Sequence, residues 1–202
     1  FTIFPWWEVN LSADWQFNLL NADLRDFVYP RRHTLLAAAA TAMRFDRVEI
    51  QASLLGTLVH DRTKGDRMSD KRKLTPAVFL SWRPFERAGI NIRAFYKRIF
   101  RMPTLNDLYY TFVGNVDLDP EFTTQYDVGI TYSRTFEHTW LRSLELQADV
   151  YYNQVDNKIV ATPTSNFFRW TMVNLGNVEI RGVDAAVQTG WAVGRDFPLT
   201  AR

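Results

Sequence analysis

Apolar and polar residues alternate one by one along most of the chain. From Trp7 to Leu19 every odd position is apolar, while the even positions between them carry polar side chains, namely Glu8, Asn10, Ser12, Asp14, Gln16 and Asn18. This period of two is typical of a β-strand with one apolar and one polar face. The run is much longer than the usual strand of about 5–6 residues. A chain built from such strands is expected to be all-β.

The same alternation recurs along the rest of the chain. It is clear in Val48–Leu58, Gln125–Tyr132 and Ser143–Tyr152, and weaker in His33–Phe45, Leu74–Trp82, Ile90–Tyr96 and Val178–Trp191. We therefore predict about eight strands, mostly of the roughly 9–11 residues that cross a bilayer at a tilt. Helical spacing also fits Leu35–Ala42. The apolar positions change parity around Gly182, which predicts a β-bulge there.

The predicted connections alternate between long and short. The long ones are Asn21–Arg32, Asp61–Lys73, Arg101–Thr123 and Gln154–Thr171, and the short ones lie around Asp46 and at Phe85–Gly89, Arg134–Trp140 and Gly194–Asp196. Outer-membrane β-barrels show this alternation, because their turns are short on the periplasmic side and their loops are long on the outer side. Aromatic residues also gather near the strand ends, as in the girdles of such barrels. Loop alternation and strand length favour a membrane barrel over a soluble all-β core.

Bulk composition excludes several classes of protein. Hydrophobic residues make up 47% of the sequence, aromatic residues 15% and charged residues 23%. The net charge of +2 is too small to indicate a nucleic-acid partner, and the lack of cysteine excludes disulfides and thiolate metal sites. No apolar run approaches the roughly 20 residues of a transmembrane helix. Barrel strands are only half apolar, so these averages are compatible with a membrane barrel.

Several motifs follow one another between Lys71 and Val193. They read "FRMPTLNDLYY" from Phe100, "GNVDLDPE" from Gly114, "TQYDVGITY" from Thr124, "DVYYNQVDNKIVATPT" from Asp149 and "NLGNVEIRGVD" from Asn174. In this order and at this spacing they resemble the C-terminal half of the barrel of TonB-dependent outer-membrane receptors. In their individual residues the motifs are similar to those of receptors from Bacteroides-type bacteria, including cobalamin receptors.

The resemblance implies a fold and a function. The fold would be an antiparallel up-and-down transmembrane β-barrel of about 22 strands around a plug domain. Residues 1–202 would be an internal fragment of that barrel, without the plug. The location would be the bacterial outer membrane. The function would be import of a scarce large nutrient by TonB-coupled uptake, with a metal chelate as substrate and cobalamin ahead of haem or siderophore.

The same resemblance implies a set of partners. They are a TonB-type energy-coupling complex acting through the absent plug, outer-membrane lipid and lipopolysaccharide, the small-molecule nutrient, and a surface lipoprotein. We expect no nucleic-acid partner, no cofactor and no resident metal.

Three alternatives remain open from the sequence. A passive outer-membrane porin has no sequence cue of its own, and a small closed barrel is expected to end in an aromatic residue rather than in Arg202. An outer-membrane hydrolase would require a histidine and a serine, or paired aspartates, converging on one rim of the barrel. His33, His60 and His138 lie apart, without metal-binding spacing. We therefore expect the protein not to be an enzyme and predict no catalytic residue.

Candidate ligand-binding residues lie in two of the predicted outer loops. In Arg101–Thr123, Tyr109 and Tyr110 each combine an apolar ring with a hydroxyl group. The alternative for these two residues is that they pack the loop onto the barrel mouth. In Gln154–Thr171 the candidates are Phe167, Phe168, Arg169 and Trp170.

Overall fold

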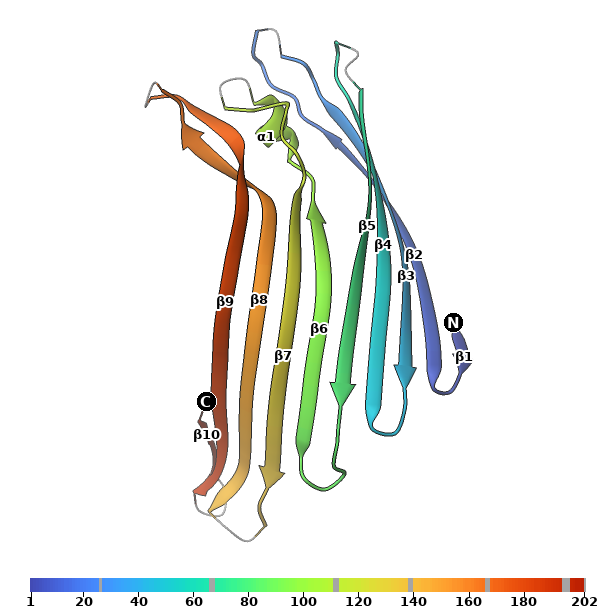
Figure 1. The fold of residues 1–202 in the computed structure, drawn as a ribbon, viewed down its shortest axis with the longest axis vertical. Helices are drawn as coiled ribbons and strands as arrows, with labels where there is room; N and C mark the ends of the chain where they lie inside the picture. Colours follow the sequence, from blue (N-terminus) through green and yellow to red (C-terminus); the bar gives the residue numbers. More distant parts are fainter. Residues whose placement is uncertain are drawn as a thin grey trace.

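A computed structural model of the chain describes residues 1–25, 27–65, 68–110, 113–137, 140–165, 168–193 and 197–201. The described residues form one antiparallel sheet in which each strand pairs with the next along the chain (Figure 1). The strands are β1 (Thr2–Phe4), β2 (Trp7–Leu19), β3 (Arg31–Arg44), β4 (Val48–Arg62), β5 (Met68–Trp82), β6 (Ile90–Arg101), β7 (Glu121–Thr135), β8 (Leu141–Pro163), β9 (Trp170–Val193) and β10 (Phe197–Ala201); a short helix, α1 (Leu105–Tyr109), lies between β6 and β7. The expected all-β, up-and-down fold is therefore confirmed, with β2 to β9 as the long strands.

The strand register gives the sheet two chemically different faces. One face, called the apolar face below, carries rows such as Leu11, Ala39 and Leu54 in β2 to β4 and Val128, Val150 and Val183 in β7 to β9. The large side chains of these rows are exposed. The opposite, polar face carries the residues between them, including Asp14, Arg32, Asp61, Arg93, Asp127 and Asp149. A broad exposed apolar face needs a nonaqueous environment, because monomeric soluble proteins rarely expose large contiguous apolar patches.

Aromatic rings border the apolar face at both ends of the sheet. Near the short turns, the ring centroids of Trp6 and Phe45 lie 5.6 Å apart. Toward the other end, Tyr126 lies between Tyr96 and Tyr152, with centroid distances of 5.2 and 6.2 Å. Amphipathic rings are favoured where an apolar medium meets water, so these two levels mark the limits of the apolar belt.

The long and short connections lie at opposite ends of the sheet, as predicted. The ends of β4 and β5, β6 and β7, and β8 and β9 that are joined to each other lie at the upper end in Figure 1, and the joined ends of β5 and β6 and of β7 and β8 lie at the lower end. Within the described part of the chain, no helix is long and apolar enough to cross a membrane.

Two predicted loops were too long. Asp61–Lys73 was expected to be a loop, yet β4 continues to Arg62 and β5 begins at Met68. Gln154–Thr171 is also mostly strand, since β8 ends at Pro163 and β9 begins at Trp170. Beyond the apolar belt the formerly apolar face carries exposed charged residues such as Arg62, while the opposite face buries side chains such as Val59 and Asp61. The alternation of apolar and polar residues therefore disappears there, while the backbone ladder continues.

One open alternative is decided and one local prediction was wrong. Leu35–Ala42 lies within β3, as the alternation over His33–Phe45 predicted, and is not helical. No bulge occurs at Gly182, because it pairs with Tyr151 in a continuous register, and the irregularity of this ladder lies between Leu141 and Ser143. A Cβ atom at position 182 would collide with the hydroxyl group of Tyr151. The glycine thus leaves room for a large aromatic side chain from the neighbouring strand.

The ladder between β5 and β6 covers only part of these strands. Ala77–Trp82 pair with Ile92–Lys97, and beyond Ala77 the two strands diverge toward the upper end of Figure 1. Pro76, which has no backbone N–H, is the residue at which pairing stops. The outer part of the sheet is therefore divided between β5 and β6, and other contacts must hold its two parts together.

Candidate functional site

Arg32 joins three segments on the polar face. Its Nε and Nη2 atoms donate to the two carboxylate oxygens of Asp61, both at 2.7 Å, and Nη1 donates to the carbonyl oxygen of Pro103 at 2.6 Å. The side chains of Arg32 and Asp61 are only 8% and 2% exposed. Since Pro103 follows β6, this buried ion pair links β3 and β4 to the far side of the divergence between β5 and β6. Sequence reasoning missed both residues.

The segment after Pro103 is an ordered and packed structure. Thr104 caps α1 by accepting a hydrogen bond from the backbone N–H of Asp107 at 3.1 Å, and the Asp107 carboxylate accepts from the backbone N–H of Thr104 at 2.9 Å. This reciprocal arrangement satisfies two backbone donors that a helix start would otherwise leave without partners. Leu108 is buried against Leu118 and Ile159. The loop thus has a small apolar core of its own.

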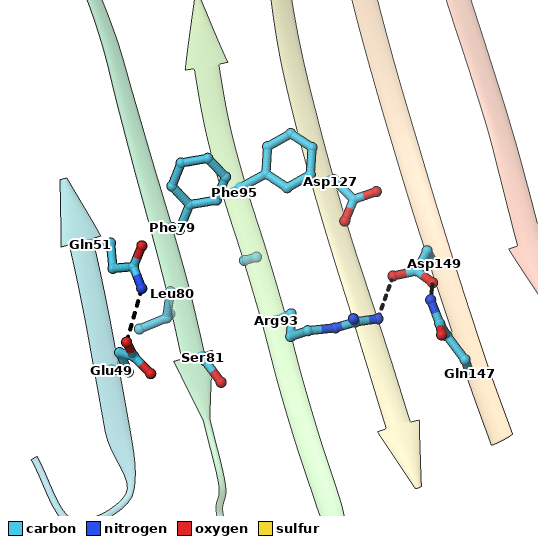
Figure 2. A pocket seen from close by; sticks show the side chains of 11 residues that line it. Glu49, Gln51, Phe79, Leu80, Ser81, Arg93, Phe95, Asp127, Gln147 and Asp149 are labelled. Atoms are coloured by element: carbon cyan, nitrogen blue, oxygen red, sulfur yellow. Dashed lines mark hydrogen bonds and ion pairs between the residues drawn. The ribbon is translucent and has the colours of Figure 1, made fainter. Parts of the chain in front are cut away.

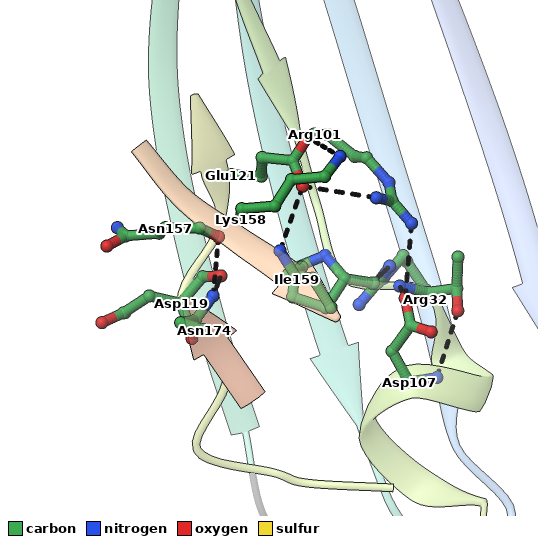
Figure 3. Close-up of polar contacts among 11 residues, drawn as sticks. Arg32, Arg101, Asp107, Asp119, Glu121, Asn157, Lys158, Ile159 and Asn174 are labelled. Atoms are coloured by element: carbon green, nitrogen blue, oxygen red, sulfur yellow. Dashed lines mark hydrogen bonds and ion pairs between the residues drawn. The ribbon is translucent and has the colours of Figure 1, made fainter. Parts of the chain in front are cut away.

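Glu121 connects this loop to its neighbours (Figure 3). Its carboxylate lies 3.4 Å from Nη1 of Arg101 and 3.3 Å from Nζ of Lys158, and it accepts a hydrogen bond from the backbone N–H of Ile159 at 3.2 Å. The side chain of Glu121 is buried, so its charge is matched by two cations and an amide rather than by water.

Asn174 makes a second set of connections, also visible in Figure 3. Its side-chain amide donates to the carbonyl oxygens of Asp119 and Asn157 at 3.0 and 2.9 Å, and its side-chain oxygen accepts from the backbone N–H of Asp119 at 2.8 Å. Asn157 has a left-handed backbone with φ of 56°, a conformation that asparagine tolerates better than most residues. One amide therefore ties the loop before β7 to β8 and β9.

The structure separates the predicted ligand-binding residues into two groups. Tyr109 packs against the apolar core formed by Leu108, Leu118 and Ile159, which supports the packing alternative for this residue. Tyr110 is 51% exposed and Phe168 is 96% exposed. Arg169 and Trp170 are also exposed, whereas Phe167 lies outside the described residues.

The two predicted loops meet beside Tyr110. The backbone N–H of Val113 donates to the carbonyl oxygen of Tyr110 at 3.1 Å, and the N–H of Met172 donates to the carbonyl oxygen of Val113 at 2.9 Å. Met172 follows Trp170 by two positions, so both candidate segments border the same outer surface. A large ligand could contact Tyr110 and the start of β9 together.

A pocket of about 460 Å³ lies on the polar face nearer the short turns (Figure 2). Arg93 of β6 extends across β7 and donates to Asp149 of β8 at 3.0 Å. Asp149 also accepts from the side-chain amide of Gln147 at 2.7 Å. Asp127 lies near this pair, and Phe79 and Phe95 form the apolar part of the wall with centroids 5.6 Å apart. The pocket is thus lined mainly by polar side chains, several of them carboxylates, and two phenylalanine rings form its apolar edge.

Gly129 makes the Arg93–Asp149 pair geometrically feasible. It lies between them in the register, opposite both residues, and a Cβ atom there would collide with the Asp149 carboxylate. Replacing Gly129 by alanine is expected to lower the free energy of unfolding by about 1–3 kcal/mol, because the added methyl overpacks a filled site. Chemical denaturation of the intact barrel measures this change.

Gly176→Ala is the matched control for Gly129→Ala. Gly176 is also in a strand, but a Cβ atom there would meet nothing within 4 Å. The control is expected to change the free energy of unfolding by less than about 0.5 kcal/mol. Equal losses in the two variants would show that the Arg93–Asp149 contact does not explain the glycine.

The polar face and the outer loops provide side chains suited to binding. Within the described residues, no three or more His, Cys, Asp or Glu side chains form a group that could hold a metal ion. His33 and His60 are paired across β3 and β4 on the apolar face, and His138 lies outside the described residues. The polar face and the outer loops instead offer charged, amide and aromatic side chains.

The chain matches a family model and a known relative over parts of its length. A family model described as "TonB dependent receptor-like, beta-barrel" matches residues 7–201. Over 93 residues, 45% of this chain and 14% of the relative, the sequence is 32% identical to the vitamin B12 transporter BtuB of Vibrio vulnificus. The chain thus spans a small part of that relative's length.

Similar solved structures share the fold at low sequence identity. The copper transporter OprC matches with a TM-score of 0.74 and 13% identity, covering 94% of this chain and 33% of that one. The hemophore receptor HasR of Serratia marcescens, in complex with HasA and heme, matches with a TM-score of 0.72 and 15% identity, covering 96% and 38%. The FrpB iron transporter of Neisseria meningitidis matches with a TM-score of 0.69 and 12% identity, covering 95% and 31%.

Proposed function

This chain belongs to the TonB-dependent receptor β-barrel family of the bacterial outer membrane, and on that premise we propose that it forms part of a transporter that imports a scarce large nutrient by TonB-coupled uptake. The family consists of outer-membrane nutrient importers. The apolar face then contacts lipid, and the polar face lines the lumen. In the proposed whole protein, further strands close the barrel and a plug domain occupies the lumen beside the polar face.

Cobalamin is the substrate that we propose first. The observation that supports it is the 32% identity to the vitamin B12 transporter over 93 residues. The similar structures include transporters of iron and copper and a receptor bound to a haem-carrying protein, so other metal-containing cargoes are the natural comparison. Coupling to an energy source is part of the proposal because the matching family model is that of TonB-dependent receptors.

The outer loops are the proposed site of capture. Tyr110, Phe168 and Trp170 are exposed beside the joined loop segments, while the contacts of Glu121 and Asn174 hold those segments in place. Preorganised loops lose less conformational entropy when a ligand binds, so more of the contact energy appears as affinity. Movement of the plug, driven by the energy-coupling complex, would then open the path along the polar face.

Binding measurements on the intact receptor test this proposal directly. We expect cobalamin to bind more tightly than haem or a ferric siderophore. Replacing Tyr110 and Phe168 together by alanine is expected to weaken cobalamin binding about tenfold to hundredfold, since a lost aromatic contact costs about 1–3 kcal/mol in a packed interface. Isothermal calorimetry or tryptophan quenching with each ligand gives the affinities. Undetectable cobalamin binding by a folded receptor would reject the substrate.

Tyr109→Ala is the neighbouring control. Because Tyr109 packs on the apolar core of the loop, its removal is expected to speed limited proteolysis between Arg101 and Glu121. Its effect on affinity should be smaller than that of the Tyr110 and Phe168 pair. If the alanine pair leaves affinity unchanged and only speeds cleavage, these residues hold the loop and do not contact ligand.

A further inference from the structure

A second pocket, of about 520 Å³, lies on the outer part of the polar face where the ladder between β5 and β6 has ended (Figure 1). Four successive residues of β6 line it, namely Lys97, Arg98, Ile99 and Phe100. In a paired strand successive side chains point to opposite faces of the sheet. A pocket reached by all four must therefore lie at the edge of β6 that faces the divergence from β5. We call it the edge pocket.

The remaining walls of the edge pocket combine polar and apolar groups. The hydroxyl groups of Thr34 and Ser53 and the side-chain amides of Gln16 and Asn18 line one part of it. Met102 continues the apolar surface begun by Ile99 and Phe100. The pocket can therefore accept hydrogen-bonding and apolar parts of one molecule at the same time.

The edge pocket carries an excess of positive charge. The residues that line it include Arg32, Lys97 and Arg98 and neither aspartate nor glutamate. The charge of Arg32 is matched by Asp61, with which it forms the buried ion pair. Among the described residues, Lys97 and Arg98 form no ion pair. Two cations thus lie at the pocket without a carboxylate partner.

Aromatic rings hold these cations in place of carboxylates. The ammonium nitrogen of Lys97 lies 5.9 Å from the centroid of the Phe95 ring, and the guanidinium carbon of Arg98 lies 4.7 Å from that of Phe122. Lys73 of β5 also reaches the Phe122 ring, at 5.2 Å. A cation–π contact attracts the charge without accepting its hydrogen bonds as a carboxylate does. The N–H donors of these cations therefore stay available to a ligand.

The lower pocket on the same face has the opposite excess of charge. Asp127 and Asp149 line it together with a single arginine, Arg93, while Glu49 is paired with Arg44. The polar face therefore changes from acidic near the short turns to basic near the outer loops. An anion that enters from the outer end meets the edge pocket first.

We propose that the edge pocket binds an anionic oxygen group of the imported nutrient, a phosphate ester or a carboxylate, while an apolar part of the same molecule lies against Ile99, Phe100 and Met102. Guanidinium groups form charge-assisted, frequently bidentate hydrogen bonds with both kinds of anion, and a lysine ammonium adds a point charge. The edge of β6 also presents backbone N–H groups, because it has no partner strand beyond Lys97 among the described residues. The proposal rests on the proposed function only in assigning the anion to the nutrient.

The first test uses small probes and does not depend on the identity of the nutrient. Phenyl phosphate and benzoate each join an aromatic ring to one of the two anionic groups, and benzyl alcohol is their neutral counterpart. Saturation-transfer NMR on the intact receptor measures the binding of each. The double variant Lys97→Gln, Arg98→Gln is expected to bind the preferred anionic probe about tenfold to hundredfold more weakly, because it loses two charged donors. Benzyl alcohol is expected to distinguish the two proteins by less than about twofold.

Arg134→Gln is the matched control. The guanidinium carbon of Arg134 lies 5.2 Å from the Phe136 ring centroid, so this arginine also contacts an aromatic ring, but at the opposite end of the sheet. It is expected to bind the probes like the wild type, and heat-modifiability on gels confirms folding of every variant. Absence of binding by the wild type, equal binding by the double variant, or an equal loss in the control would overturn the proposal.

The second test identifies the source of the anion. Cobalamin contains a phosphate ester that cobinamide lacks, and haem contains two carboxylates that its dimethyl ester lacks. For the nutrient that binds, the double variant is expected to lose affinity for the anionic form and to retain it for the form without the anion. Equal losses for both forms would overturn the assignment of the anion to the nutrient. If the probes bind but neither nutrient does, the proposed substrates fail while the edge pocket remains an anion site.

Discussion

Replacing Arg32 by alanine is expected to lower the free energy of unfolding of the intact barrel by about 3–5 kcal/mol. The change leaves the Asp61 carboxylate, only 2% exposed, without its cation. It also leaves the carbonyl oxygen of Pro103 without its donor. These losses fall where β5 and β6 are not paired, so few other contacts can compensate. Denaturant titration of the receptor in detergent micelles measures the effect.

Two further variants distinguish this explanation from a general loss of charge. Arg44→Ala removes an exposed arginine that pairs with Glu8 at 3.1 Å, and it is expected to have little effect because water already solvates both groups. Replacing Arg32 and Asp61 together by leucine is expected to cost less than Arg32→Ala, since no buried charge is then left alone. If Arg32→Ala were as mild as Arg44→Ala, the buried pair would not hold the two parts of the sheet together.

The two faces of the sheet could be predicted because each long strand crosses an apolar belt. Leu11, Leu54 and Val150 were assigned to the apolar face from alternation alone, and the register confirms each assignment. The strand ends could not be placed in this way. Outside the belt the two faces are no longer divided into apolar and polar, so Asp61 and Lys73 look like loop residues although they lie within the β4–β5 ladder.

The Arg32–Asp61 pair was missed although the sequence contains a signal for it. The hairpin around Asp46 pairs Arg44 with Glu49, and the same register continued outward places Arg32 opposite Asp61. Extending each short turn into a full ladder would therefore have found this buried pair. The Arg93–Asp149 contact is harder to predict, because it joins β6 to β8 across β7 and depends on the missing side chain of Gly129.

Which of Tyr109 and Tyr110 is exposed could not be predicted from the sequence. They are adjacent and chemically identical, and they lie at the end of one short helix. One packs on the loop core and the other is exposed, because successive side chains of a helix point about 100° apart. Choosing between them requires the position of Leu118 and Ile159, which come from later parts of the chain.

Replacing Leu11 by arginine is expected to lower the free energy of unfolding of the membrane-inserted barrel by about 2–4 kcal/mol. Leu11 is 66% exposed on the apolar face. It lies midway along β2 between Trp7 and Trp15, which border the belt on the same face. A cation at this position would therefore sit near the middle of the hydrocarbon, where neither headgroup level is easily reached.

Ser12→Arg provides the control, because Ser12 is the next residue of β2 and lies on the polar face opposite Ala38. A charge there meets the lumen, so its cost is expected to be small. Refolding of the intact receptor into lipid vesicles of defined thickness, followed by denaturant titration, gives both values. Equal costs at the two positions would contradict the assignment of faces. A large cost at Leu11 alone would establish that β2 crosses the membrane with its odd-numbered residues toward lipid, because the even-numbered residues of the same strand then face the lumen.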